Sequence, residues 1–188
     1  MVWVKSEYAE ELAVLVTWLS ALVPWSISYG SFAVTSGGDL TLVILRFPFV
    51  GIRYQLGVQI LGGTSVRTPL QFRQEVLNAG GSASAQVPGY DLWLVGLAIL
   101  AVAVLVSLLL YFEVEDALDA IPADPVRVLG ALLLGVAVAL LGSTYVLFTS
   151  QAALFVPFGV FLQLAFGVIL LRVDRTGVDD ADADAESA

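Results

Sequence analysis

The sequence predicts a membrane all-α protein with four transmembrane helices and a small α+β extracytoplasmic insertion between the first and second helices. Three observations predict this class. Of the 188 residues, 59% are hydrophobic and only 13% are charged, and a soluble domain of this size cannot bury that much apolar surface. Long charge-free runs recur along the chain. One Gly-rich, Arg-containing stretch, residues 30–90, interrupts these runs.

The first span is predicted over residues 11–29, after a cytoplasmic N-terminal segment of residues 1–10. An apolar run of this length suits a hydrocarbon core of about 30 Å, and Trp25 and Tyr29 suit its interfacial belt. A cleaved signal peptide is the alternative. The acidic residues before the run favour an uncleaved anchor helix.

The insertion, residues 30–90, predicts strands over about 40–58 and a helix over about 69–78. A fifth span through residues 40–61 is the alternative, but Arg46 and Arg53 together would cost about 5–7 kcal/mol of insertion free energy. Thr68-Pro69-Leu70-Gln71 has the form of a capping box with Pro at the first helical position. We therefore expect a small folded unit on the membrane surface.

The rest of the chain predicts three more spans. They cover residues 91–112, 128–148 and 152–171, with an acidic cytoplasmic loop at 113–127 and an acidic, disordered cytoplasmic tail at 172–188. Only three residues join the last two spans, which predicts an antiparallel helical hairpin. Lys and Arg flank spans on the cytoplasmic side, so Lys5, Arg127, Arg172 and Arg175 place both termini in the cytoplasm and residues 30–90 outside it.

Composition excludes several classes of function. The sequence has no cysteine and no histidine, which excludes disulfides, thiol nucleophiles and His-based acid–base catalysis. No charged residue lies inside the apolar runs 12–29, 92–112, 128–148 and 152–171, whereas proton and ion pathways normally need one. We expect no enzymatic activity, no catalytic residue, no cofactor and no metal site.

The charge balance predicts the environment of the protein. Seventeen acidic residues and eight basic residues give a net charge of −9. Acid-rich surfaces with little lysine suit a cytoplasm of very high salt, where screening removes self-repulsion. This balance predicts a halophilic archaeal source. It also argues against nucleic acid as a partner, because phosphates need basic side chains.

Four arginines of the insertion are candidate contacts for a ligand carboxylate or for anionic lipid head groups. They are Arg46, Arg53, Arg67 and Arg73. Pairing with local acidic side chains is the ordinary alternative. The carboxylates of the 113–127 loop could bind a divalent cation, but that loop lacks the Gly turn and alternating ligands of calcium sites.

Two sets of small or polar residues predict close helix packing. Ala131, Gly135, Ala139 and Ser143 follow one another at four-residue spacing, as do Gly159, Gln163 and Gly167. Small side chains let helix backbones approach closely, and an amide within a membrane usually bonds a neighbouring helix. The partner helix could belong to the same chain or to a second copy in a homo-oligomer.

Residues 3–29 (WVKSEYAEELAVLVTWLSALVPWSISY), with Arg46-Phe-Pro-Phe and Arg53-Tyr, resemble a family of small haloarchaeal membrane proteins that has no assigned function. The resemblance implies the same four-helix plan and supplies no catalytic residue. We expect a non-enzymatic envelope protein that binds or scaffolds partners through its extracytoplasmic loop, in the lipid bilayer and within a membrane complex. The alternative is a small-molecule or lipid-handling protein with a cavity between helices and loop.

Overall fold

The computed structural model describes residues 8–34, 38–57, 63–114, 123–151 and 153–173. The elements follow one another as α1 (Ala9–Leu22), β1 (Ser26–Val34), β2 (Gly38–Arg46), β3 (Gly51–Leu56), β4 (Thr64–Arg67), α2 (Pro69–Ala79), the 3₁₀ helix η2 (Gly81–Gln86), α3 (Val87–Tyr111), α5 (Pro125–Ser150), β5 (Leu154–Val156) and α6 (Phe158–Leu171). The structure is therefore a mixture of helices and sheet, not an all-α bundle with a small insertion.

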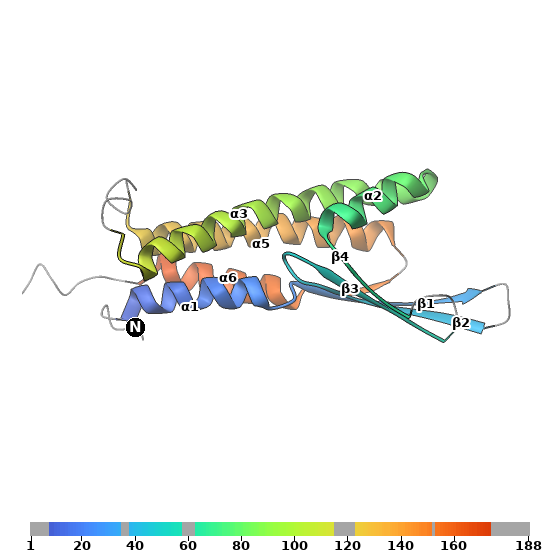
Figure 1. Ribbon diagram of the computed structural model, residues 1–188, viewed down its shortest axis with the longest axis horizontal. Coiled ribbons are helices and arrows are strands. Elements are labelled where there is room, and N and C mark those ends of the chain that lie inside the picture. Colours follow the sequence, from blue (N-terminus) through green and yellow to red (C-terminus); the bar gives the residue numbers. More distant parts are fainter. Residues whose placement is uncertain (1–7, 35–37, 58–62, 115–122, 152, 174–188) are drawn as a thin grey trace, which may run out of the picture.

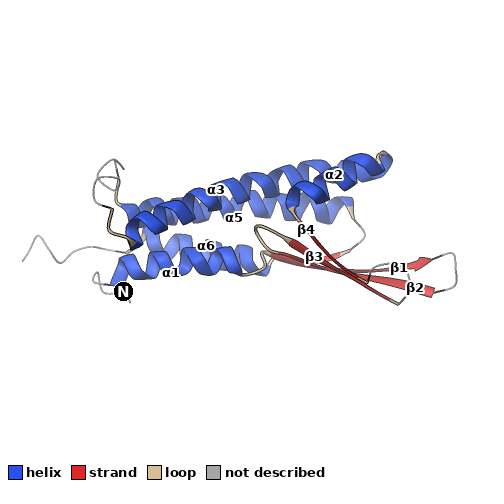
Figure 2. Ribbon diagram, viewed as in Figure 1, coloured by secondary structure: helices blue, strands red, loops and turns tan. Residues whose placement is uncertain are grey.

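The elements form two layers along the long axis of the molecule (Figure 1). The long helices α3 and α5 make one layer. The short helices α1 and α6 begin the other, and the sheet continues it beyond their ends (Figure 2). The core between the layers is made of buried aliphatic side chains such as Leu100, Leu133 and Leu140.

The sheet has five antiparallel strands in the order β4-β3-β2-β1-β5. The strands predicted over 40–58 correspond to β2, β3 and the turn that contains Pro48. The described part of 40–61 is therefore strand and turn, which excludes a helical fifth span there. β1, β4 and β5 were not predicted, and β1 and β5 come from the ends of two predicted spans.

The helical interpretation of residues 11–29 is wrong at its end. Helix α1 stops at Leu22, and Val23 has an extended backbone (φ −83°, ψ 138°). The cause is Pro24, because proline disfavours the helical conformation in the residue before it and cannot donate the helical hydrogen bond. The next residues then pair with β2, beginning at Ser26 opposite Arg46.

The same correction applies to residues 152–171. Leu154–Val156 is a strand paired with β1, and α6 begins only at Phe158, after Pro157. The other two predicted spans, 91–112 and 128–148, are each one helix, α3 and α5, and both helices start earlier than predicted. Helix α2 begins with the capping box of Thr68 and Gln71.

Two described helices, Gly81–Tyr111 and Pro125–Ser150, are long and apolar enough to cross a membrane, by length and composition. Helices α1 and α6 have 14 residues each, or about 21 Å at 1.5 Å per residue. The predicted tail from residue 174 on, the loop residues 115–122 and residues 1–7 lie outside the described residues.

Candidate functional site

The inward face of the sheet carries most of the polar chemistry of the described chain. Side chains alternate between the two faces of a strand. Ser26, Ser28, Arg46 and Arg53 therefore share the face that packs against α2, α3 and α5, and Arg67 joins them opposite Gly51. An antiparallel sheet usually turns its apolar face inward, so this polar face is a candidate site.

Arg46 is fully buried, with an exposed fraction of 0%. Its Nη1 donates a hydrogen bond to Ser28 Oγ at 2.8 Å, and its guanidinium carbon lies 5.1 Å from the ring centroid of Phe155. Its Nε and Nη2 have no hydrogen-bond partner among the described residues. A cation–π contact offsets only part of the free-energy cost of burying a cation. The charge of Arg46 beneath the sheet is therefore only partly compensated by its contacts with Ser28 and Phe155.

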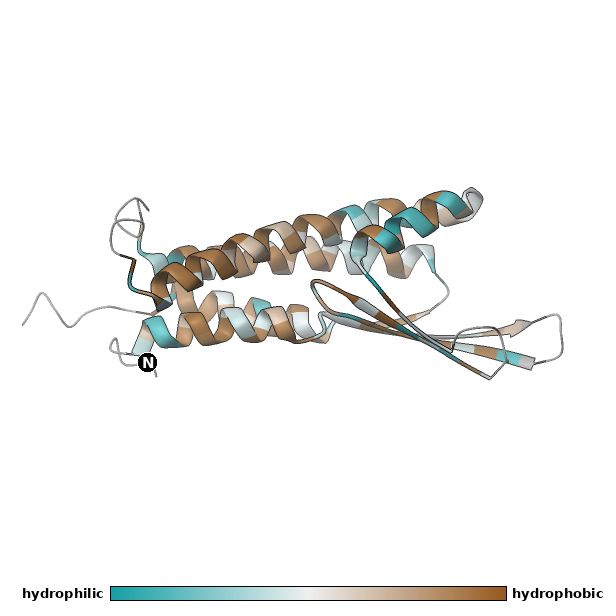
Figure 3. Cartoon of the chain, in the orientation of Figure 1, coloured by the Kyte–Doolittle hydropathy of each residue, from teal (hydrophilic) through white to brown (hydrophobic). Residues whose placement is uncertain are grey.

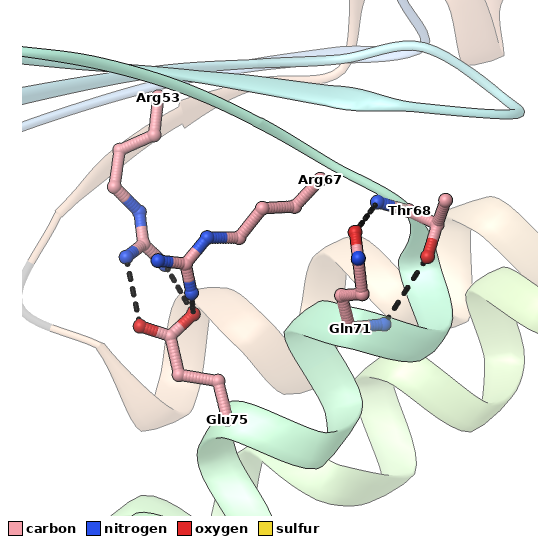
Figure 4. Close-up of polar contacts among 5 residues, drawn as sticks. All are labelled: Arg53, Arg67, Thr68, Gln71 and Glu75. Carbon is pink, nitrogen blue, oxygen red and sulfur yellow. Dashed lines mark hydrogen bonds and ion pairs between the residues drawn. The ribbon is translucent and has the colours of Figure 1, made fainter.

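Arg53 and Arg67 converge from two strands on one carboxylate of α2, that of Glu75 (Figure 4). Arg53 Nη1 and Nη2 donate to the two oxygens of Glu75 at 2.9 and 3.2 Å, and Arg67 Nη1 donates to Glu75 Oε2. Partial burial raises the pKa of Glu75, but the hydrogen bonds and charges of Arg53 and Arg67 outweigh it and hold the pKa below its usual value. These pairs fasten α2 to the sheet.

The fourth candidate, Arg73, pairs on another side of α2. Its Nε lies 2.5 Å from Asp91 Oδ1 at the start of α3. Three of the four arginines thus have the local acidic partners that were the ordinary alternative. The four arginines share the carboxylates of Glu75 and Asp91, so these six side chains together keep two positive charges although the whole chain carries −9.

A cleft of about 360 Å³ opens between the inward face and the helices. It is lined by Phe32, Leu42, Ile44, Arg53, Glu75, Val76, Ala79, Ala83, Gln86, Tyr90 and Gln151. The walls are mainly apolar, with one ion pair and the bonded amides of Gln86 and Gln151 (2.6 Å) at the rim. Such a cleft suits an apolar group that carries one polar or anionic end.

An aromatic cluster fixes the sheet on the helices below this cleft. The ring centroids of Trp25 and Trp93 lie 5.4 Å apart, and Trp93 Nε1 donates to the carbonyl of Pro48 at 2.9 Å. Phe72 of α2 lies over Gly51, where a Cβ would come within 2.4 Å of the Phe72 ring. Sequence reasoning missed this cluster, because its members come from four separate elements.

The predicted packing residues do not form one contact surface. Ala139 and Ser143 are buried, and Ser143 Oγ donates to the carbonyl of Gly89 on α3 at 2.7 Å. Ala131 is exposed, and Gly135 is only partly buried. Along α5, these four residues therefore change from contact with α3 at Ser143 to exposure at the surface at Ala131.

The second set lies along α6, where its residues face different neighbours. A Cβ on Gly159 would lie 2.7 Å from the carbonyl of Pro24, and one on Gly167 would lie 2.9 Å from the carbonyl of Gly130 on α5. Gln163 is buried, with no hydrogen-bond partner for its Oε1 among the described residues. The sequence analysis did not predict the contact of Gly130 with Gly167, because Gly130 is not one of the residues at four-residue spacing.

A second cavity, of about 640 Å³, lies at the opposite end of the bundle between α1 and the end of α3. Glu10, Glu11 and Glu113 line it together with Trp18 and Tyr111. Among the described residues, no three potential metal ligands gather closely enough to hold an ion. The acidic residues 115–122, which the cation alternative also needs, lie outside the described part of the chain.

The sequence matches the model of a "Family of unknown function (DUF7549)" over residues 2–175. The chain belongs to this family. No curated protein matches the sequence. Since the family carries no assigned activity, the function must be argued from the geometry of the helices and the sheet.

Proposed function

We propose that the protein is a non-enzymatic integral membrane protein that crosses the bilayer four times and binds partners through its sheet and α2. The observation that carries the proposal is that α3 and α5 are made of hydrophobic residues along most of their length (Figure 3) and leave many of these side chains exposed. Leu105 of α3 is 61% exposed and Val138 of α5 is 66% exposed. Hydrophobic exposure all round a helix suits hydrocarbon and not water.

The short helices extend the same surface. On α1 the side chains of Leu15, Trp18 and Leu22 are exposed, while the small residues Ala13 and Thr17 face the bundle. On α6 Phe161 is 62% exposed. All four helices thus present apolar side chains outward, which supports four membrane-crossing segments although α1 and α6 are short.

The charges support an orientation with the sheet outside the cell. Arg127 lies in the first turn of α5 and Arg172 follows α6, both at the end of the bundle away from the sheet. Basic residues near span ends favour the cytoplasmic side. The acidic composition of the chain supports a high-salt cytoplasm, as in a halophilic archaeon.

The binding role rests on the inward face and its cleft. Two positive charges remain after the four arginines are balanced against Glu75 and Asp91. In the cleft, Arg53 lies beside apolar walls. We expect the partner to be another membrane protein or a second copy of the chain. Lipid or small-molecule handling is the second candidate, and the 360 Å³ cleft is the observation that favours it.

Topology is tested by cysteine labelling in intact cells, because the chain has no native cysteine. Ser82→Cys, on η2, should react with an impermeant maleimide from outside, and Ser187→Cys should react only after the membrane is opened. Labelling of Ser187→Cys from outside would overturn the orientation. Labelling of Leu105→Cys, six residues before the end of α3, would overturn the membrane-spanning proposal itself.

The two binding roles are separated by purification from native membranes. A binding or scaffolding protein predicts that a photocrosslinker at Ser82 traps a protein in a defined band. A lipid-handling protein instead predicts one co-purified lipid species that is lost on Ala83→Trp, which fills the cleft wall, and kept in the control Val138→Trp on the outside of α5. Monomer alone, with no bound lipid, contradicts both roles.

A further inference from the structure

The outward face of the sheet is graded in polarity along the strands. The strand register brings one residue from each of the five strands into a single row at the end nearest α1 and α6. We call it the base row: Val156, Ile27, Leu45, Ile52 and Val66. All five side chains are aliphatic.

The rows further from the helices become more polar. The second row is Leu154, Tyr29, Val43, Tyr54 and Thr64. The third row is Ser31, Thr41 and Leu56, and Ala33 with Asp39 follows it. Aliphatic side chains, then tyrosines, then hydroxyls and a carboxylate are the order met on leaving a bilayer through its interface.

The outward side chains are exposed on the two edge strands and partly exposed on the central strands, as at Ile27, Leu45 and Ile52. Val66 is 63% exposed, Leu154 is 62% exposed and Val156 is 47% exposed. The opposite face holds the arginines and serines of the candidate site. A sheet that faces water usually turns its apolar face inward. Here the inward face mixes these polar side chains with apolar ones such as Leu42 and Ile44, while the outward base row is entirely aliphatic.

The lengths of the elements require something besides helix to cross the membrane. Helices α1 and α6, with 14 residues each, rise about 21 Å against a hydrocarbon core of about 30 Å. The missing distance of about 9 Å equals about three extended residues. Val23–Ile27 after α1, and Val156 and Pro157 before α6, supply residues of this kind.

Contacts with α3 place the base of the sheet near one limit of a hydrocarbon core of about 30 Å. Trp25, which precedes β1, packs on Trp93 and donates its backbone N–H to the carbonyl of Arg46 at 2.8 Å. Trp93 precedes Leu110 by 17 residues of one helix, or about 25 Å. The base row begins two residues beyond Trp25. Measured from Leu110 along α3, this level is near the outer limit of a hydrocarbon core of about 30 Å.

The turn between β2 and β3 is apolar, like the base row. Its sequence is Phe47-Pro48-Phe49-Val50, and Phe49 is 43% exposed. It lies at the α1 end of the sheet, because Phe47 follows Arg46 and Val50 precedes Gly51. An apolar turn at this level suits lipid contact. Backbone groups at membrane depth must be bonded within the protein. β1, which continues α1, is paired on both sides at residues 27–29, whereas β4 and β5 are the edges of the sheet and each pair with one strand.

We propose that the base row and Phe49 lie in the outer leaflet and contact lipid hydrocarbon, with Tyr29 and Tyr54 at the level of the head groups. The first and last membrane crossings are then part helix and part strand. The polar inward face, with Arg46, is kept from lipid by α2, α3 and α5. This inference rests on the proposed membrane-spanning function.

The test uses nitroxide spin labels on single cysteines in the full-length protein, reconstituted into phosphatidylcholine vesicles. The label sites are Val156 and Val66 in the base row, Leu56 in the third row, and Leu105, six residues before the end of α3. Their exposed fractions are close (47%, 63%, 55% and 61%), so differences report the surroundings. Collisions with oxygen report lipid, and collisions with a water-soluble nickel chelate report water.

The inference predicts that labels at Val156 and Val66 collide with oxygen and lose nickel collisions, as at Leu105, while Leu56 keeps them. Nickel collisions at Val156 and Val66, with Leu105 in lipid, would overturn lipid contact and leave the membrane-spanning proposal intact. Nickel collisions at Leu105 would overturn that proposal. Low collision rates for both reagents at the base row would mean that a second protein surface covers it, which also overturns lipid contact.

Discussion

At the scale of residues, three arginines of the insertion (Arg46, Arg53 and Arg67) lie on the inward face of the sheet, and the fourth, Arg73, pairs with Asp91 of α3. Arg46 has no carboxylate partner among the described residues and one hydrogen bond, to Ser28. Glu75 carries two arginines at once. Glu75 therefore links α2 by ion pairs to both β3 and β4.

Replacing Glu75 with glutamine tests this attachment. Glu75→Gln should lower the free energy of unfolding by about 1–2 kcal/mol at pH 7, less than for a buried pair, because the carboxylate is partly screened by solvent. The pKa of Glu75 is lowered by folding. Its contribution is therefore full above the usual carboxyl range near pH 4.3 and is lost as the pH falls through the lowered value.

The measurement is thermal unfolding of both proteins in detergent micelles from pH 7 down to pH 3. The difference between them should narrow in acid. Glu113→Gln, at the opposite end of the bundle, is the control and should leave the melting temperature unchanged at every pH. A difference that grew in acid would contradict the ion-pair role of Glu75.

At the scale of elements, two prolines turn apolar runs into helix–strand pairs. Pro24 separates α1 from β1, and Pro157 separates β5 from α6. Both strands then join one sheet, with Ile27 opposite Val156. The sheet is held on the helices by the contact between Gly51 of β3 and Phe72 of α2.

A methyl group at Gly51 tests that contact. Gly51→Ala would place its Cβ 2.4 Å from the Phe72 ring, so overpacking should lower the free energy of unfolding by about 1–3 kcal/mol. Gly63→Ala, whose Cβ would meet nothing closer than 3.9 Å, is the matched control. Chemical unfolding of the double variant Gly51→Ala/Phe72→Leu should recover part of the loss. Additive losses would show that the two residues do not contact each other.

At the scale of the whole molecule, helices of two lengths share one bundle. Helices α3 and α5, with 25 and 26 residues, are about 37 and 39 Å long, and α1 and α6 are about 21 Å long. Only the sheet fills the difference in the second layer (Figure 1). In the membrane-spanning arrangement proposed above, the apolar part of the second layer is about 21 Å thick without the base row and thicker with it.

Bilayers of different acyl-chain length measure this thickness. If the base row contacts lipid, thermal stability should be greatest in bilayers with a hydrocarbon core of about 30 Å and should fall in cores near 21 Å, by fractions of a kcal/mol per Å of mismatch. The reconstituted protein should be compared across saturated and unsaturated phosphatidylcholines of graded length. A maximum in the thinnest bilayers would mean that only the short helices α1 and α6 set the thickness.

Local sequence patterns anticipated the elements that depend on near neighbours. The hydrophobic runs of α3 and α5 and the capping box of Thr68 and Gln71 are legible because hydropathy and capping act over a few residues. Of the candidate site, the sequence predicted only the set of arginines. That Glu75 would receive Arg53 and Arg67, and that Arg46 would be buried against Phe155, depends on elements far apart in the chain.

The sequence by itself determined the apolar character of the helices, the absence of cysteine and histidine chemistry, the acidic charge and the starts and stops imposed by proline. Tertiary structure decided which residues of the two apolar runs predicted as spans, 11–29 and 152–171, became strand. Residues 26–29 (Ser-Ile-Ser-Tyr) come at the end of an apolar run. Their conformation follows from pairing with β2 and with Leu154–Val156, more than 100 residues away. Backbone pairing between distant segments leaves no local pattern, so only the folded chain reveals the sheet and its graded outward face.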